Sequence, residues 1–180
     1  MPASGGRVLI SGASVAGPVL AYWLSRFGFQ PTVVEKTAEL RFGSGGHAVD
    51  LFGPALKIIE WMGALPRVRD ARTRNEIISL LRPGHPPVDV PAELMSEGVS
   101  EQHVEIMRGE LAKIAYETGR HDVEYLFGNS ISALEQTEQG VEVSFRHGAT
   151  RTFDLVVGAD GLHSITRQLV FGEEHKFLNF

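Results

Sequence analysis

The residues with the clearest chemical meaning form a glycine-rich turn near the start of the chain. The segment Gly12-Ala13-Ser14-Val15-Ala16-Gly17 follows a short apolar run and precedes an apolar stretch with helical spacing. Gly12 permits a tight turn, Gly17 allows a helix to pack closely on a strand, and free N–H groups at the helix start face a pyrophosphate. Ser14 replaces the middle glycine of this pattern, which is tolerable if its φ is ordinary and its hydroxyl donates to a phosphate. The spacing predicts a dinucleotide site.

An acidic residue completes this pattern. Glu35 follows Gly12 by about 20 residues, at the end of a second predicted strand, where a carboxylate accepts hydrogen bonds from a ribose diol. A carboxylate there repels a 2′-phosphate, so the adenosine should belong to FAD or NAD rather than NADP. The alternative interpretation is an ordinary β–α–β unit with a glycine-rich turn.

Composition limits the other functions. The 180 residues carry a net charge of −5 without a long basic tract, so nucleic acid is not an expected partner. The absence of cysteine excludes disulfides and thiol chemistry. No apolar run approaches the ~18 residues that cross a bilayer, and no signal-peptide pattern opens the chain, which predicts a cytoplasmic protein without a membrane partner. The histidines show no metal-ligand spacing, and neither a metal site nor a catalytic triad is predicted.

The elements that must position these residues alternate between strands and helices, as in an α/β fold. Residues 91–102 receive no assignment, and the arginines of 67–74 are expected on a solvated face or loop. The predicted helices are Val15–Phe27, one opened by Pro54 and closed by Gly63, Gly109–Thr118 and Ser164–Val170; the predicted strands are Val8–Ser11, Thr32–Glu35, Ile77–Leu81, Val88–Val90, Val123–Phe127, the hairpin of Ile131–Leu134 and Val141–Phe145, and Phe153–Gly158.

Two predicted strands end in small residues. Ser11-Gly12 ends the first, and Gly158-Ala159-Asp160-Gly161 ends a nearly continuous apolar run of the kind found in strands buried on both faces of a parallel sheet. In open parallel sheets, ligands lie beyond the carboxyl ends of the strands. We therefore expect both strand ends to point toward one ligand.

Three segments, in this order, resemble the class A flavoprotein monooxygenases, the p-hydroxybenzoate hydroxylase-like family that includes tetracycline-modifying enzymes. They are GASVAG with Glu35, RGELAKIAYE and DLVVGADGLHSITRQ. The resemblance implies a Rossmann-like FAD-binding domain over 1–180, with a parallel central sheet, β-hairpin insertions and an incomplete substrate-domain sheet to which about 75–106 contributes. It implies FAD as the cofactor, NADPH or NADH as the reductant, and hydroxylation of an aromatic or polyketide-like small molecule with O2. Since the cofactor performs this chemistry, no catalytic residue is implied.

The resemblance also assigns roles by position. The glycine turn cradles the pyrophosphate, Glu35 holds the ribose, and Arg108 contacts the ribityl and phosphate region. Asp160-Gly161 match a DG motif near the pyrophosphate and the NADPH route, to which Arg167 also belongs, and Gly45–Asp50 resembles a segment that passes the flavin. Ordinary alternatives are a helix-start arginine for Arg108 and a helix cap for Asp160. The predicted cofactor-binding residues are Gly12, Ala13, Ser14, Ala16, Gly17, Glu35, Lys36, Arg41, Asp50, Arg108, Asp160 and Gly161.

The family pattern continues beyond these motifs to a Gly-Asp motif that this sequence lacks. We therefore expect either the N-terminal half of a monooxygenase or a short form that needs self-association or a second chain to complete its sheet. A non-catalytic dinucleotide-binding module and an NAD-dependent dehydrogenase domain remain alternatives, because Glu35 would serve NAD equally well. The DG motif and Arg108 argue against the dehydrogenase.

Overall fold

The computed structural model describes residues 5–40, 47–74, 77–91 and 103–176. The chain forms two compact units, one made of residues 1–44 and 112–180 and the other of residues 45–111. Each unit is considered by itself below.

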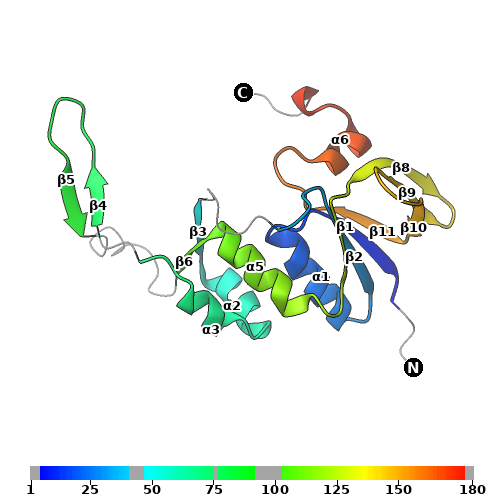
Figure 1. The fold of residues 1–180 in the computed structure, drawn as a ribbon, viewed down its shortest axis with the longest axis horizontal. Coiled ribbons are helices and arrows are strands. Elements are labelled where there is room, and N and C mark those ends of the chain that lie inside the picture. The colour runs from blue at the N-terminus through cyan, green and yellow to red at the C-terminus, as the bar shows by residue number, and fades with distance from the viewer. Residues whose placement is uncertain (1–4, 41–46, 75–76, 92–102, 177–180) are drawn as a thin grey trace. The chain divides into compact units, whose positions relative to one another are not determined.

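The first unit is built on a parallel sheet of four strands, β1 (Arg7–Ser11), β2 (Gln30–Glu35), β7 (Glu124–Phe127) and β11 (Leu155–Gly158). Their spatial order is β11-β1-β2-β7, and the register places Ser11 beside both Val34 and Gly158. Strands β11, β1 and β2 lie side by side in Figure 1. The helix α1 (Ala16–Arg26) connects β1 to β2. The carboxyl ends of β1, β2 and β11 therefore meet at one edge, as the sequence predicts.

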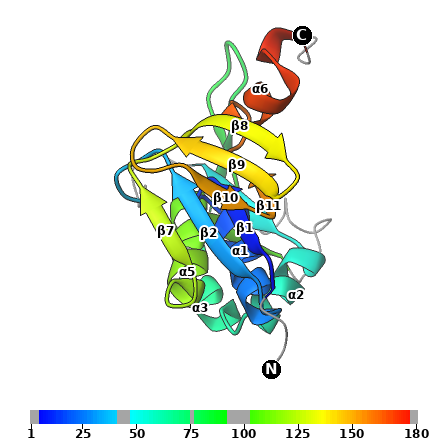
Figure 2. The same ribbon diagram turned by 90° about the vertical axis from the view of Figure 1, so that its right-hand side faces the viewer.

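The sheet is covered by helices on one face and by a second sheet on the other (Figure 2). Strands β8 (Ile131–Thr137), β9 (Gly140–Phe145) and β10 (Arg151–Phe153) form this antiparallel second sheet. Because side chains alternate along a strand, Val8 and Ile10 of β1 pack in the cluster that includes Ala21 of α1. Leu9, between them, packs in the cluster that includes Phe153 of β10. Strand β1 therefore lies in the middle layer of three, with one set of its side chains packed against the helices and the other against the second sheet.

Two further helices belong to the first unit, one of them only in part. Helix α5 (Arg108–Gly119) starts in the second unit, and its Tyr116 ring meets Tyr125 of β7 edge-on, with centroids 4.7 Å apart. Helix α6 (Ile165–Phe171) follows β11 and precedes a short 3-10 turn, Glu174–Lys176. Both helices confirm predicted elements.

The described residues of the second unit include two short antiparallel ribbons and two helices. Strand β3 (Ala48–Leu51) pairs with β6 (Val104–Met107), and β4 (Ile77–Leu80) pairs with β5 (Val88–Pro91). Helix α2 (Gly53–Trp61) matches the prediction, whereas no helix was predicted where α3 (Leu65–Asp70) forms; its arginines are exposed, in agreement with the expected solvated face. It forms because Val68 is fully buried, although the neighbouring Arg67 and Arg69 are exposed.

The prediction of one strand over Phe153–Gly158, buried on both faces, is wrong. The run divides at Asp154, because Phe153 ends β10 in the antiparallel sheet and Leu155 begins β11 in the parallel one. The N–H of Asp154 donates to the Arg7 carbonyl at 2.9 Å, and its carboxylate accepts the Arg7 N–H at 2.6 Å. β11 lies at an edge of the four-stranded sheet, and Leu155 is 52% exposed.

Candidate functional site

The turn between β1 and α1 leaves no room for side chains at two glycines. Gly12 has a φ of 107°, which glycine adopts far more readily than other residues, and a Cβ there would lie 2.5 Å from the Ala159 carbonyl oxygen. A Cβ on Gly17 would overlap the Gly12 carbonyl oxygen. The N–H of Gly12 donates to the Val34 carbonyl at 2.8 Å, which ties the turn to β2. Backbone is thus left bare where the motif predicts close approach by a phosphate.

The start of α1 faces this turn without a side-chain cap. Val15 is the N-cap residue and makes no capping hydrogen bond through its side chain, and the first turn contains no acidic residue. Ser14 and Ala16 are exposed, and no described residue other than glycine has a positive φ, so Ser14 has the ordinary φ that the substitution for glycine requires, while its bond to a phosphate stays a prediction. Uncapped N–H groups at the positive end of a helix suit an anion.

Glu35 is held beside the turn by its own chain. One carboxylate oxygen, Oε2, accepts the Ala13 N–H at 2.9 Å. The other, Oε1, accepts both the N–H and the hydroxyl of Thr37 at 3.0 Å. The predicted proximity of Glu35 to the glycine turn is confirmed, and Oε2 keeps acceptor capacity for a further donor. Lys36 follows it and is exposed.

Asp160 lies just beyond β11 and is bonded on several sides. Its Oδ1 accepts the Ser164 hydroxyl at 2.5 Å, and its Oδ2 accepts the N–H and the hydroxyl of Thr166, both at 3.0 Å. The Ser11 hydroxyl of β1 reaches the same Oδ2 at 3.3 Å. Burial raises the pKa of Asp160, but the bonds from Ser164 and Thr166 outweigh burial and hold the pKa below its ordinary value.

These bonds make Asp160 part of the cap of α6. Ser164 is the N-cap residue and accepts the Arg167 N–H at 2.9 Å, while Asp160 accepts the N–H of Thr166, one position earlier. The Arg167 guanidinium donates to the Leu162 carbonyl at 2.5 Å. The helix-cap interpretation of Asp160 therefore describes its geometry, and a direct role with a ligand stays a prediction.

The remaining predicted residues belong to the second unit or lie outside the described residues. Asp50 is exposed on β3, opposite Glu105 of β6. Arg108 is exposed at the start of α5, and its N–H donates to the His47 carbonyl at 3.2 Å. Both belong to the second unit. Arg41, with Gly45 and Gly46, lies outside the described residues.

The structure thus gathers most of the predicted cofactor-binding residues and adds some that the sequence analysis did not select. The predicted residues at the carboxyl edge of the parallel sheet are Gly12, Ala13, Ser14, Ala16, Gly17, Glu35, Lys36, Asp160 and Gly161. Ser11, Thr37 and Thr166 were missed, although each bonds one of the two carboxylates. The only sequence signal that could have indicated these partners is the serine just before the last helix, since serine is typical of helix caps.

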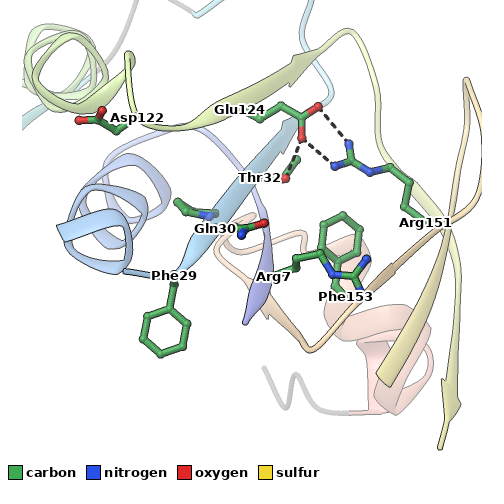
Figure 3. A pocket seen from close by; sticks show the side chains of 9 residues that line it. Arg7, Phe29, Gln30, Thr32, Asp122, Glu124, Arg151 and Phe153 are labelled. Carbon is green, nitrogen blue, oxygen red and sulfur yellow. Dashed lines mark hydrogen bonds and ion pairs between the residues drawn. The ribbon is translucent and has the colours of Figure 1, made fainter. Parts of the chain in front are cut away.

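A surface pocket of about 300 Å³ lies toward the amino ends of the same strands (Figure 3). Two of its charged groups are paired: Arg151 forms two hydrogen bonds to Glu124, at 2.8 and 3.1 Å, and Glu124 also accepts the Thr32 hydroxyl at 2.8 Å. The bond from Arg151 is the main cause that lowers the pKa of Glu124. The pocket is lined by Arg7, Phe29, Gln30, Pro31, Thr32, Asp122, Glu124, Arg151 and Phe153.

Metal-ligand clusters are absent from the described part of the chain. It contains no group of three or more His, Asp or Glu side chains placed to hold a metal ion. None of its helices is both long and apolar enough to span a membrane.

Comparison with known proteins gives consistent matches over nearly the whole chain. A sequence model for an FAD binding domain family matches residues 6–176. An uncharacterized protein of Mycobacterium tuberculosis is 43% identical over 173 residues, which are 95% of this chain and 46% of that protein. A flavin-dependent monooxygenase of Legionella longbeachae is 38% identical over 172 residues, which are 92% of this chain and 42% of that protein.

Solved structures show the same fold. The tetracycline destructase Tet(51) superposes with a TM-score of 0.79 at 37% identity, over 93% of this chain and 42% of that one. CtdE, solved in complex with FAD, superposes with a TM-score of 0.76 at 21% identity, over 94% of this chain and 42% of that one, which supports the fold alone. The chain spans less than half the length of each of these relatives.

Proposed function

Because the chain belongs to the family of FAD binding domains, we propose that it is the FAD-binding portion of a flavoprotein monooxygenase. The enzyme would use NADPH or NADH and O2 to hydroxylate an aromatic or polyketide-like small molecule. The Legionella relative, a flavin-dependent monooxygenase, and the similarity to a tetracycline destructase support this substrate class. We further propose a cytoplasmic location and completion of the site by more polypeptide, by a second chain or by self-association.

The carboxyl edge of the parallel sheet is the observation that carries the proposal. The absence of a Cβ at Gly12 and Gly17 lets the turn pack against the Ala159 carbonyl and against the start of α1, and the uncapped start of α1 offers N–H groups beside it. A pyrophosphate fits these donors, with Ala13, Ser14 and Ala16 in the same turn. The free acceptor capacity of Glu35 Oε2 fits a ribose hydroxyl. The residues present therefore suit FAD.

The other proposed contacts follow from position in the family pattern. Lys36 and Arg41 would lie near the adenine or pyrophosphate, Asp50 near the flavin, and Arg108 near the ribityl chain. Asp160 and Gly161 would border the pyrophosphate. The bound cofactor supplies hydride acceptance from NADPH or NADH and the activation of O2, while these residues bind and orient it.

FAD titration of the purified chain tests the proposal. We expect micromolar or tighter binding, followed by flavin fluorescence, with the mass in solution determined in the same sample. A folded chain that takes up no FAD would overturn the proposal. Stronger binding of NAD than of FAD would instead favour the dehydrogenase alternative.

Catalysis needs a separate measurement. NADPH or NADH oxidation coupled to O2 uptake by the FAD-loaded chain would support the monooxygenase part of the proposal. FAD binding without any reduction by either nucleotide would favour a non-catalytic dinucleotide-binding module.

A further inference from the structure

Thr166 donates twice to one oxygen of Asp160. Its side chain is 7% exposed, and both its N–H and its hydroxyl lie 3.0 Å from Oδ2. Ser11, 8% exposed, donates to the same oxygen from β1. Two of the buried polar residues of the first unit therefore donate hydrogen bonds to a single carboxylate, and they come from distant parts of the sequence.

The backbone beside this carboxylate forms one wall of the glycine turn. A Cβ on Gly12 would lie 2.5 Å from the Ala159 oxygen and 2.9 Å from the Asp160 Cα. The N–H of Ala159 donates to the Ser11 carbonyl at 2.8 Å. A shift of the Asp160 segment would therefore move atoms that touch Gly12.

Thr166 also packs directly against the end of β11. A Cβ on Gly158 would lie 3.2 Å from the Thr166 Cβ, so little free space separates the strand end from the helix. The threonine thus fixes the segment twice, by contact at Gly158 and by hydrogen bonds at Asp160. Neither contact requires Thr166 to touch a ligand itself.

We infer that Thr166 is a positioning residue of the cofactor site: it holds the Asp160 carboxylate, and Asp160 holds the backbone against which the Gly12 turn packs. The inference rests on the proposed FAD site. It assigns to a residue that is not among the predicted cofactor-binding residues an effect on affinity that acts through the turn.

A pair of matched threonines provides the test. Thr166→Val keeps the N–H and the shape but removes the hydroxyl, and we expect an FAD dissociation constant about three- to tenfold higher, as for loss of a bond to a charged group. Thr166→Ser restores the hydroxyl and should return the constant to within about twofold of the original chain. Thr32→Val removes an equally buried hydroxyl, 4% exposed and 2.8 Å from the Glu124 carboxylate, and should leave FAD affinity unchanged.

Amide hydrogen exchange of the ligand-free chain gives a second readout. Thr166→Val should speed exchange of the Gly12 and Ala159 amides, which are bonded at the turn, and Thr32→Val should not. If the original chain binds no FAD, the proposed function fails, and this exchange pattern still decides the positioning role. If the chain binds FAD but both valine variants change affinity and exchange alike, or neither does, the inference is overturned and the proposed function stands.

Discussion

The two ends of the parallel sheet hold their carboxylates with different hydrogen-bond donors. Toward the amino ends, carboxylates meet guanidinium groups: Glu124 pairs with Arg151, and Asp154 lies 3.9 Å from Arg7. At the carboxyl ends, the hydrogen bonds described for Glu35 and Asp160 come from backbone N–H groups and hydroxyls.

This difference distinguishes carboxylates that stabilise the structure from carboxylates that can bind a ligand. A carboxylate paired with arginine is neutralised within the protein, as Glu124 is by Arg151 in the pocket at the amino ends. A carboxylate held by neutral donors is fixed in place but still negative, and it can accept a hydroxyl of a ligand. Gly12 and Gly17 lie at that end, beside the uncapped start of α1, which is why we place the cofactor there.

The largest expected effect comes from adding a side chain at a glycine of the turn. Gly17→Ala places a Cβ on the Gly12 carbonyl oxygen, so helix and strand must separate. We expect FAD affinity to fall by at least about 100-fold, because the N–H groups no longer converge on the phosphates. FAD titration measures this change. Gly53→Ala is the control, since a Cβ at Gly53 meets nothing within 4 Å; equal losses in both variants would contradict the assignment.

Removing the charge of Glu35 should have the next largest effect. Glu35→Gln keeps the shape, but its amide group must face either the Ala13 N–H or the Thr37 donors. We expect FAD to bind about 10-fold more weakly, in line with ~1 to 3 kcal/mol for a hydrogen bond to a charged group. Calorimetric titration measures this, with exposed Glu135→Gln on β8 as the control. Unchanged affinity would remove Glu35 from the site.

Arg108 tests whether the second unit takes part in binding. Its side chain is exposed at the start of α5, so Arg108→Ala should leave the melting temperature nearly unchanged. We expect about three- to tenfold weaker FAD binding from the loss of one charged contact. Arg82→Ala, also exposed in the second unit, serves as the control. Identical affinity of the two variants would confine the site to the first unit.

The smallest effect should follow from opening the ion pair at the other end of the sheet. Glu124→Gln removes a half-exposed pair with Arg151 and should cost at most about 1 kcal/mol of unfolding free energy, without changing FAD affinity. The folded-state pKa of Glu124 lies below its ordinary value of 4.5, so this stabilisation is present above that pH and is lost as the pH falls below it.

Urea unfolding at pH 7 and at pH 3 measures this contribution. The difference between the original chain and Glu124→Gln should be present at pH 7 and shrink at pH 3. A change in FAD affinity comparable to that of Glu35→Gln would erase the distinction between the two ends of the sheet.

Local spacing was sufficient to predict the glycine turn, its helix and the position of Glu35. These features depend on the backbone conformations that glycine permits and on the usual lengths of a strand and a helix. Residues close together in the sequence determine these conformations and lengths. The hairpin of β8 and β9 was predictable for the same reason, since alternating apolar residues flank a short turn.

Contacts between distant segments were not predictable. The break at Asp154 depends on Arg7, and an apolar run gives no sign that its first and last residues enter different sheets. The role of Thr166 depends on Asp160 lying over Gly12, which follows only once β1 and β11 are neighbours. The helix α3 was missed because one buried valine among arginines leaves almost no amphipathic signal.

The central place of β1 also bears on how the chain folds during synthesis. Strand β1 has β2 on one side, nearby in sequence, and β11 on the other, with Arg7 and Asp154 separated by 147 positions. A nascent chain can form β1, α1 and β2 early, but one edge of β1 stays open until β11 leaves the ribosome. Closing so long a loop is slow compared with local pairing, and an open apolar edge invites pairing with other chains. Strand β1 is thus made before β11 but enclosed only after it, and during this interval its open edge is exposed to pairing with other chains.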